Sequence, residues 1–211
     1  MKKLILPLLL LVAFGMLAAV ESDPSNIVGY VKYTLYAGNN GIALPMEQGY
    51  TQASAVGNAI TGCTTVRTFN GATQAWVAAT KTPFGTWTNN FTVSAGDPLW
   101  IYTPTAGTFY SIGNLPDDLR TPPYTIYANA NSWIMIPLSK SALNTAALLG
   151  NNIPGCTTVR NFNGATQAWV AAAKTPFGTW TNSYATTIGM PLWIYSTIAG
   201  TWPNSYPELS K

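Results

Sequence analysis

The sequence predicts a mainly β protein of the α+β class, built from two tandem homologous small domains with about six strands and one helix each. Three observations lead to this prediction. A block of the chain occurs twice, short apolar runs alternate with polar residues as strands do, and turn signals separate these runs. Only one segment in each copy has the three- and four-residue spacing of a helix.

The repeat is strongest over residues 62–89 and 155–182, which differ only at the pairs Thr68/Asn161 and Thr80/Ala173. Weaker similarity extends on both sides and gives a period of 91 to 93 residues. This length is typical of a small domain and too long for a solenoid unit. Either gene conversion keeps the block uniform, or the block performs the same task twice.

The repeat also sets the expected domain boundaries. We expect a first β-rich module at residues 21–113, a linker at 114–123, a second module at 124–205 and a C-terminal tail at 206–211. The linker concentrates prolines and three of the few charges, as connections between domains often do.

Strands are expected at the start of each copy. Residues 28–37 are rich in Val, Tyr and Leu, which favours a first strand. A second short apolar strand is expected at residues 42–46, and at 133–138 in the second copy.

A helix is expected next. In the second copy, apolar residues recur at helical spacing over residues 142–149, with Ser139 or Ser141 as the cap and Gly150 as the end. The equivalent segment of the first copy, residues 50–60, has a weaker helical pattern.

A hairpin follows, with strands over residues 64–69 and 76–79 and a turn over 70–73. The turn contains Asn-Gly between extended runs, a strong hairpin signal. Residues 87–93 then alternate between apolar and polar, and residues 99–102 are apolar on both faces, as in a central strand.

The N-terminus has the pattern of a secretory signal peptide over residues 1–20. Lys2 and Lys3 precede an apolar run over residues 4–20 that ends in small residues. The alternative is an uncleaved anchor, for which the run is slightly short and contains Pro7. Cleavage removes two lysines, so the formal net charge of +3 falls to about +1. We expect a secreted or extracytoplasmic protein with no membrane span after cleavage.

The composition excludes several classes of function. Only 8% of residues are charged, where a typical domain has about 25%. The chain has no His, so imidazole catalysis and His ligation of a metal are excluded. No basic cluster suits a nucleic acid. The acidic residues are not repeated, and Asp97 corresponds to Met190. We expect neither an enzyme nor a metal or cofactor site.

Cys63 and Cys156 occupy equivalent places in the two copies. Each enters an apolar strand, where a small buried thiol packs well, so free buried thiols are favoured. A disulfide between the modules is the alternative, because secreted proteins often contain one.

The repeated block contains the candidate ligand residues. Indole rings beside amide side chains suit a sugar, since the ring covers an apolar sugar face and the amides bond its hydroxyls. The alternative is that these tryptophans hold the small cores together. The candidates are Asn70, Gln74, Trp76 and Trp87, with their copies Asn163, Gln167, Trp169 and Trp180.

The stretch over residues 66–76 is similar to the hairpin of kelch-type propeller blades. Two copies with a period near 92 residues cannot close a propeller, however. Together with the strand at residues 42–46, the hairpin more closely resembles tandem Trp-rich β modules of uncharacterised bacterial secreted and cell-surface proteins. That resemblance implies surface display or adhesion without catalysis.

The function predicted from the sequence is that of a secreted non-catalytic protein in adhesion or structural assembly. The expected partner is a glycan, an envelope component or another copy of the chain. The alternative is a tandem carbohydrate-binding protein that uses the repeated Trp, Asn and Gln surface.

Overall fold

The computed structural model describes residues 28–116 and 123–203. The expected signal peptide at residues 1–20, the tail at 206–211 and part of the expected linker lie outside the described residues. Within the described ranges, no helix is long and apolar enough to cross a membrane.

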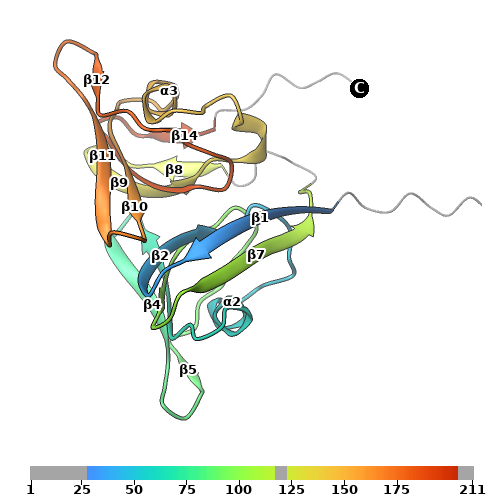
Figure 1. The fold of residues 1–211 in the computed structure, drawn as a ribbon. Helices are drawn as coiled ribbons and strands as arrows, with labels where there is room; N and C mark the ends of the chain where they lie inside the picture. The colour runs from blue at the N-terminus through green and yellow to red at the C-terminus, as the bar shows by residue number, and fades with distance from the viewer. Residues whose placement is uncertain (1–27, 117–122, 204–211) are drawn as a thin grey trace, which may run out of the picture.

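The first module contains seven strands and one α-helix (Figure 1). They are β1 (Val28–Leu35), β2 (Gly38–Ala43), α2 (Ala53–Ala59), β3 (Thr65–Asn70), β4 (Ala75–Lys81), β5 (Trp87–Thr88), β6 (Pro98–Thr103) and β7 (Gly107–Asn114).

The second module contains the equivalent elements and one additional 3-10 turn. They are β8 (Tyr124–Ile126), β9 (Ala130–Met135), η1 (Leu138–Lys140), α3 (Ala146–Asn152), β10 (Cys156–Asn163), β11 (Ala168–Lys174), β12 (Trp180–Thr181), β13 (Pro191–Ser196) and β14 (Gly200–Trp202).

Both modules have the same antiparallel topology. Five strands form a sheet in the order β2-β6-β3-β4-β5 in the first module and β9-β13-β10-β11-β12 in the second. The other two strands of each module pair as a ribbon, β1 with β7 and β8 with β14. The predicted fold class, mainly β with two similar modules that each contain one α-helix, is confirmed.

Two local predictions about the sheet are also confirmed. The predicted hairpin is β3–β4, in which Phe69 lies opposite Trp76. The segment that is apolar on both faces is β6, which lies between β2 and β3 inside the sheet.

Each module has its own hydrophobic core between the sheet, the helix and the ribbon. In the first module, Val66 and Ile101 of the sheet share a buried cluster with Val56 of α2 and with Leu35 and Phe109 of the ribbon. The equivalent cluster of the second module joins β10 and β13 to α3 and to the ribbon β8–β14. The tandem repeat therefore produces two small cores.

The predicted start of the second helix is wrong. α3 begins after Thr145, whose side chain accepts a hydrogen bond from the Leu148 N–H at 3.2 Å. Thr145 therefore caps the helix in place of Ser139 or Ser141. Its backbone is fixed by an isolated antiparallel bridge to Ala185, a contact distant in sequence that no helical periodicity can indicate.

Gly150 lies inside α3 and does not end it. A Cβ at Gly150 would overlap the ring of Trp180, so the helix needs a glycine where the indole packs. Gly57 of α2 has the same relation to Trp87. These two glycines therefore allow each helix to pack closely against an indole ring of its own module.

The extended segment after the hairpin is shorter than the alternation suggests. β5 ends at Thr88 because Asn89 has a left-handed φ of 51°, which interrupts the extended backbone. Trp87, Phe91 and Val93 all pack in the first core nevertheless, so the predicted apolar face is correct.

Candidate functional site

The turn between β3 and β4 lies where the two modules meet. We call this turn, residues 70–74 and 163–167, the inner turn. Asn70 Oδ1 accepts hydrogen bonds from two backbone N–H groups of its turn at 3.0 and 3.2 Å, and Asn163 does the same at 3.0 and 3.3 Å. Both asparagines therefore shape the turn.

Each inner turn ends in a glutamine that binds the backbone of the other module. Gln74 Nε2 donates to Asn131 O at 2.9 Å, and Gln74 Oε1 accepts from Asn131 N at 2.9 Å. Gln167 makes the same pair of bonds with Asn39, at 2.9 and 2.8 Å. β9 and β2 are edge strands, so their outer backbone groups have no neighbouring strand. Each glutamine side-chain amide forms the two backbone hydrogen bonds that a neighbouring antiparallel strand would form there. We call these pairs the glutamine clamps.

The contact between the modules has pseudo-twofold symmetry. Besides the clamps, the Tyr33 hydroxyl donates to Gly189 O at 2.9 Å, and the equivalent Tyr124 hydroxyl donates to Gly96 O at 2.6 Å. Burial raises the pKa of both tyrosines, so both hydroxyls stay protonated as donors. Each of these hydrogen bonds recurs with the modules exchanged, as in a twofold homodimer.

Seven aromatic rings fill the centre of this contact. Trp76 stacks on Trp193 with ring centroids 5.3 Å apart, and Trp169 stacks on Trp100 at 5.2 Å. Trp133 lies 5.9 to 6.2 Å from all four of these indoles. Pairs of this kind add to the free energy of area burial. We call the set the aromatic cluster: Phe69, Trp76, Trp100, Trp133, Phe162, Trp169 and Trp193.

Trp133 breaks the symmetry of the cluster. Its equivalent in the first module is Gly41, as the strand registers show, because Trp133 pairs with Trp193 and Gly41 pairs with Trp100. A Cβ at Gly41 would lie 2.9 Å from Pro191 Cγ and 3.9 Å from Trp133 Cη2. The glycine therefore leaves room for a single indole between the modules.

The structure brings six of the eight predicted ligand residues to the contact between the modules. The side chains of Asn70 and Gln74, and of their copies, form hydrogen bonds within the protein there. Trp76 and Trp169 pack in the aromatic cluster yet remain 41% and 42% exposed. The cluster therefore keeps an edge that faces solvent.

Trp87 and Trp180 lie apart from the other six, at the base of the β4–β5 hairpin and its copy. Trp87 Nε1 donates to Asn58 Oδ1 at 2.9 Å, and the Lys81 ammonium lies 5.9 Å from the centre of the ring. Trp180 makes the same two contacts in the second module, at 2.9 and 6.0 Å. Together with the helix glycines, these contacts fix the hairpin to its own module.

The hairpin ends in a second turn that we call the outer turn, residues 82–86 and 175–179. The Thr82 N–H donates to Thr86 O at 2.7 Å, and the two threonine hydroxyls are also 2.7 Å apart. Gly85 has a φ of 85°, which glycine adopts without strain. The second copy has the same bonds at the same distances. Both outer turns are therefore closed by the same backbone and hydroxyl hydrogen bonds.

Each outer turn presents a phenylalanine to solvent. Phe84 is 94% exposed and Phe177 is 93% exposed. Figure 1 shows the two hairpins extending from opposite ends of the molecule. Neither phenylalanine is among the residues predicted from the sequence, although Pro-Phe-Gly contains a signal. Proline and glycine mark a turn, and an aromatic ring between them lies outside the core.

Cys63 and Cys156 are free thiols buried in different cores. Burial raises their pKa values to about 11 and about 12, so both remain protonated and poorly nucleophilic at neutral pH. Across the described ranges, no three His, Cys, Asp or Glu side chains are grouped so that they could hold a metal ion.

No protein-family model, curated protein or solved structure matches this chain. The features of the described residues that bear on function are the aromatic cluster, the outer turns and the contact between the modules.

Proposed function

We propose that the protein is a secreted, non-catalytic protein of the cell surface or extracellular space, and that it acts in adhesion or structural assembly by bridging two copies of one target. The observation that carries the proposal is the pair Phe84 and Phe177, nearly fully exposed on identical turns at opposite ends of the molecule (Figure 1).

The outer turn is suited to act as an apolar anchor. Its backbone and hydroxyl hydrogen bonds hold it in one shape, so binding costs little conformational entropy. The ring of Phe84 gains free energy when it enters an apolar pocket of a partner. Its neighbours in the turn, Pro83, Gly85 and the threonines, are uncharged, so no charge is desolvated.

The placement of the two turns favours bridging over simple binding. Identical turns recognise the same chemistry, and turns at opposite ends of the molecule can each engage a separate target. Where the targets are repeated on one surface or on associated particles, two weak contacts made by one chain act with avidity. The expected leader at residues 1–20 and the charge-poor body are consistent with this role outside the cytoplasm.

The experiment compares binding with bridging. The secreted chain and three variants (Phe84→Ser, Phe177→Ser and the double variant) are tested for sedimentation with envelope particles of the producing cells, for agglutination of those particles, and for self-association by analytical ultracentrifugation. We expect the native chain to bind and to agglutinate or assemble, each single variant to bind without bridging, and the double variant to do neither.

A matched control is Tyr30→Ser, which removes an aromatic ring that is 68% exposed on β1. This variant is expected to behave like the native chain. Bridging by a single variant, binding by the double variant, or a strictly monomeric native chain without affinity for envelope or itself would contradict the proposal.

The second candidate function is carbohydrate binding by the exposed edge of the aromatic cluster. The solvent-facing rings of Trp76 and Trp169 favour it. A glycan array would then show binding that Trp76→Ala and Trp169→Ala reduce while Trp87→Ala does not. Equal glycan binding by all three variants would exclude the edge of the aromatic cluster as the sugar-binding surface.

A further inference from the structure

Each five-stranded sheet has one side that faces its own core and one side that does not, which we call the open face. Val66 on β3 and Ile101 on β6 lie in the core. Because side chains alternate along a strand, the neighbouring residues Arg67 and Trp100 lie on the open face. The two open faces meet in the aromatic cluster, whose stacked pairs each join one module to the other. The open-face residues that matter below are Arg67, Trp76 and Trp100, with their copies Arg160, Trp169 and Trp193.

Arg67 lies beside the exposed edge of the cluster. It is directly opposite Trp100 on β6 and directly opposite Ala78 on β4. Trp76 is its diagonal neighbour on β4, because Trp76 lies opposite Phe69. Diagonal neighbours in an antiparallel sheet are about 7–8 Å apart, within reach of a long side chain. The guanidinium of Arg67 and the indole of Trp76, which is 41% exposed, therefore share one patch of surface.

The second module repeats this arrangement. Arg160 lies opposite Trp193 on β13 and opposite Ala171 on β11. Its diagonal neighbour is Trp169, which lies opposite Phe162 and is 42% exposed. The two arginines are therefore related by the pseudo-twofold axis and lie on either side of the aromatic cluster.

Neither arginine has a partner within the described part of the chain. No hydrogen bond, ion pair or ring contact joins the side chain of Arg67 or Arg160 to another described residue. The lysines of the same repeated block differ, because Lys81 and Lys174 each lie over a tryptophan ring of their own module. A guanidinium is always charged and presents five N–H donors. The fold therefore leaves both groups of donors unused.

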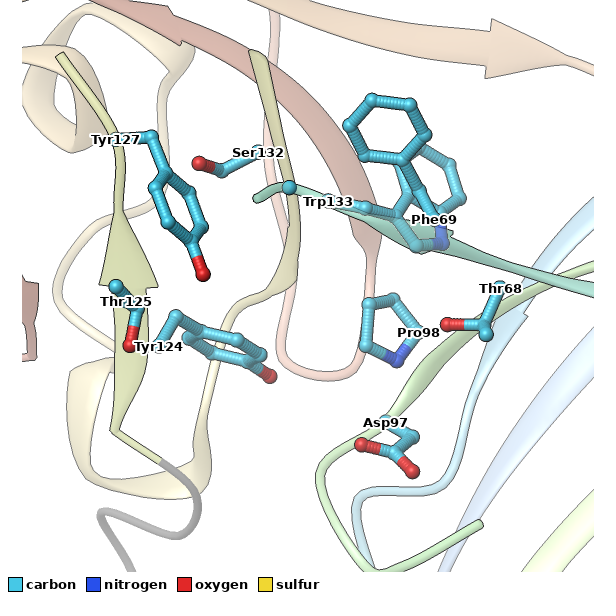
Figure 2. A pocket seen from close by; sticks show the side chains of 10 residues that line it. Thr68, Phe69, Asp97, Pro98, Tyr124, Thr125, Tyr127, Ser132 and Trp133 are labelled. Atoms are coloured by element: carbon cyan, nitrogen blue, oxygen red, sulfur yellow. The ribbon is translucent and has the colours of Figure 1, made fainter. Parts of the chain in front are cut away.

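Among the described residues, no acidic side chain belongs to a strand of either open face. The described ranges contain two acids, Glu47 and Asp97, and both precede or follow the strands of the first sheet. Glu47 forms an isolated bridge with Asn114 of the ribbon β1–β7. Asp97 lines a pocket together with Tyr124 of the ribbon β8–β14 (Figure 2). Each open face therefore combines one positive charge with an exposed indole and no neighbouring carboxylate.

We infer that the open faces bind a polysaccharide that contains uronic acid units. The ring of such a unit has an apolar face that suits an exposed indole. Its planar carboxylate accepts two parallel hydrogen bonds from a guanidinium. This specificity rests on the second candidate function, carbohydrate binding by the exposed edge of the aromatic cluster, and names the class of sugar.

The kind and number of the charges favour this class of ligand over others. Both copies have an arginine, whose planar fork matches a carboxylate, whereas a lysine would offer only a point charge. A nucleic acid also has rings that stack on indoles, but its backbone is bound by clusters of Lys and Arg, and each open face has a single arginine. A neutral sugar would use the indole and leave the guanidinium without an anion.

The test is isothermal titration calorimetry of the secreted chain with oligosaccharides of hyaluronan, alginate and polygalacturonate. Each oligosaccharide is used in its native form and after chemical reduction of its carboxylates to neutral hydroxymethyl groups. We expect at least one native oligosaccharide to bind. Its reduced form is expected to bind about tenfold more weakly or less, because the charge-assisted hydrogen bonds are lost.

Two variants and a control locate the binding. Arg67→Met and Arg160→Met remove the charge and keep an unbranched side chain, and each is expected to weaken binding of the native oligosaccharide about tenfold. The control is Lys32→Met, which removes one positive charge from an exposed position of β1 and is expected to leave binding unchanged. All three variants change the net charge equally, so a general attraction of polyanions would affect them alike.

Several results would overturn the inference. Equal binding of native and reduced oligosaccharides, weakened by Trp76→Ala, would overturn the uronic acid specificity while supporting carbohydrate binding by the cluster. Failure of every oligosaccharide to bind in either form would contradict both. Binding of dextran sulfate or single-stranded oligothymidylate alone, or an equal loss in Lys32→Met and Arg67→Met, would indicate a general polyanion surface instead. The outer turns take no part, so the Phe84→Ser, Phe177→Ser chain should bind the oligosaccharide normally even if the bridging proposal fails.

Discussion

The inner and outer turns belong to the same nearly identical repeated block, but the inner turn lies at the contact between the modules and the outer turn lies in solvent. The inner turn is polar, and its Gln74 binds the other module. The outer turn carries Phe84, which remains in solvent. Composition alone would place the phenylalanine at a contact and the glutamine in water. The comparison shows that a repeated surface can serve an internal contact at one end and remain available at the other.

The largest expected effect concerns the contact made by the inner turn. Trp133→Ala should lower the free energy of unfolding by about 3–5 kcal/mol, because the buried ring touches four other indoles and leaves a cavity. Unfolding in urea, monitored by circular dichroism, measures this change in the free energy of unfolding. A loss below about 1 kcal/mol would show that the modules hold together without the cluster.

The next effect concerns the base of the outer turn. Gly→Ala within a helix normally stabilises a protein by about 0.5–1 kcal/mol. Gly57→Ala should instead destabilise it by about 1–3 kcal/mol, because the new Cβ overlaps the Trp87 ring. The control is the same change in a Trp87→Ala background, where the penalty should disappear. An equal loss of stability in that background would mean that overlap with the indole is not the reason why this position requires glycine.

Removing one glutamine clamp should have a smaller effect. Gln74→Ala should cost about 1–2 kcal/mol, since two hydrogen bonds to the Asn131 backbone are lost. Gln167→Ala should cost the same, whereas Thr73→Ala in the same turn should change stability by less than about 0.5 kcal/mol. Clearly unequal costs for the two glutamines would break the pseudo-twofold description.

The smallest effect on stability is expected at the tips. Phe84→Ala and Phe177→Ala should each change the free energy of unfolding by less than about 0.5 kcal/mol, because the rings touch almost nothing in the folded chain. Thermal unfolding in parallel with the native chain tests this. A clear loss of stability would mean that the phenylalanines have a structural role.

Local patterns predicted much of the fold. Asn70-Gly71 between extended runs located the β3–β4 hairpin, and the apolar run at residues 99–102 located a strand inside the sheet. The start of α3 was missed because it depends on an isolated bridge between Thr145 and Ala185. Tertiary contacts of this kind override local helical spacing.

The candidate site was less predictable than the fold. The repeat predicts Gln74 and Trp76 as candidate ligand residues, but the partner of Gln74 is the backbone of Asn131 in the other module, which no side-chain pattern reveals. A pocket between the modules is lined by Ser132 and Trp133 of the second module and by Asp97 of the first (Figure 2). Only the docked arrangement brings them together.

The course of β4 and β11 has a mechanical consequence. Each strand starts beside an inner turn, at Ala75 or Ala168, and ends beside an outer turn, at Lys81 or Lys174. Tension between two targets held at the tips would therefore run along these strands and cross from one module to the other through the clamps and the stacked indoles. Under such a load the joint between the modules, rather than either core, would set the force at which the molecule yields.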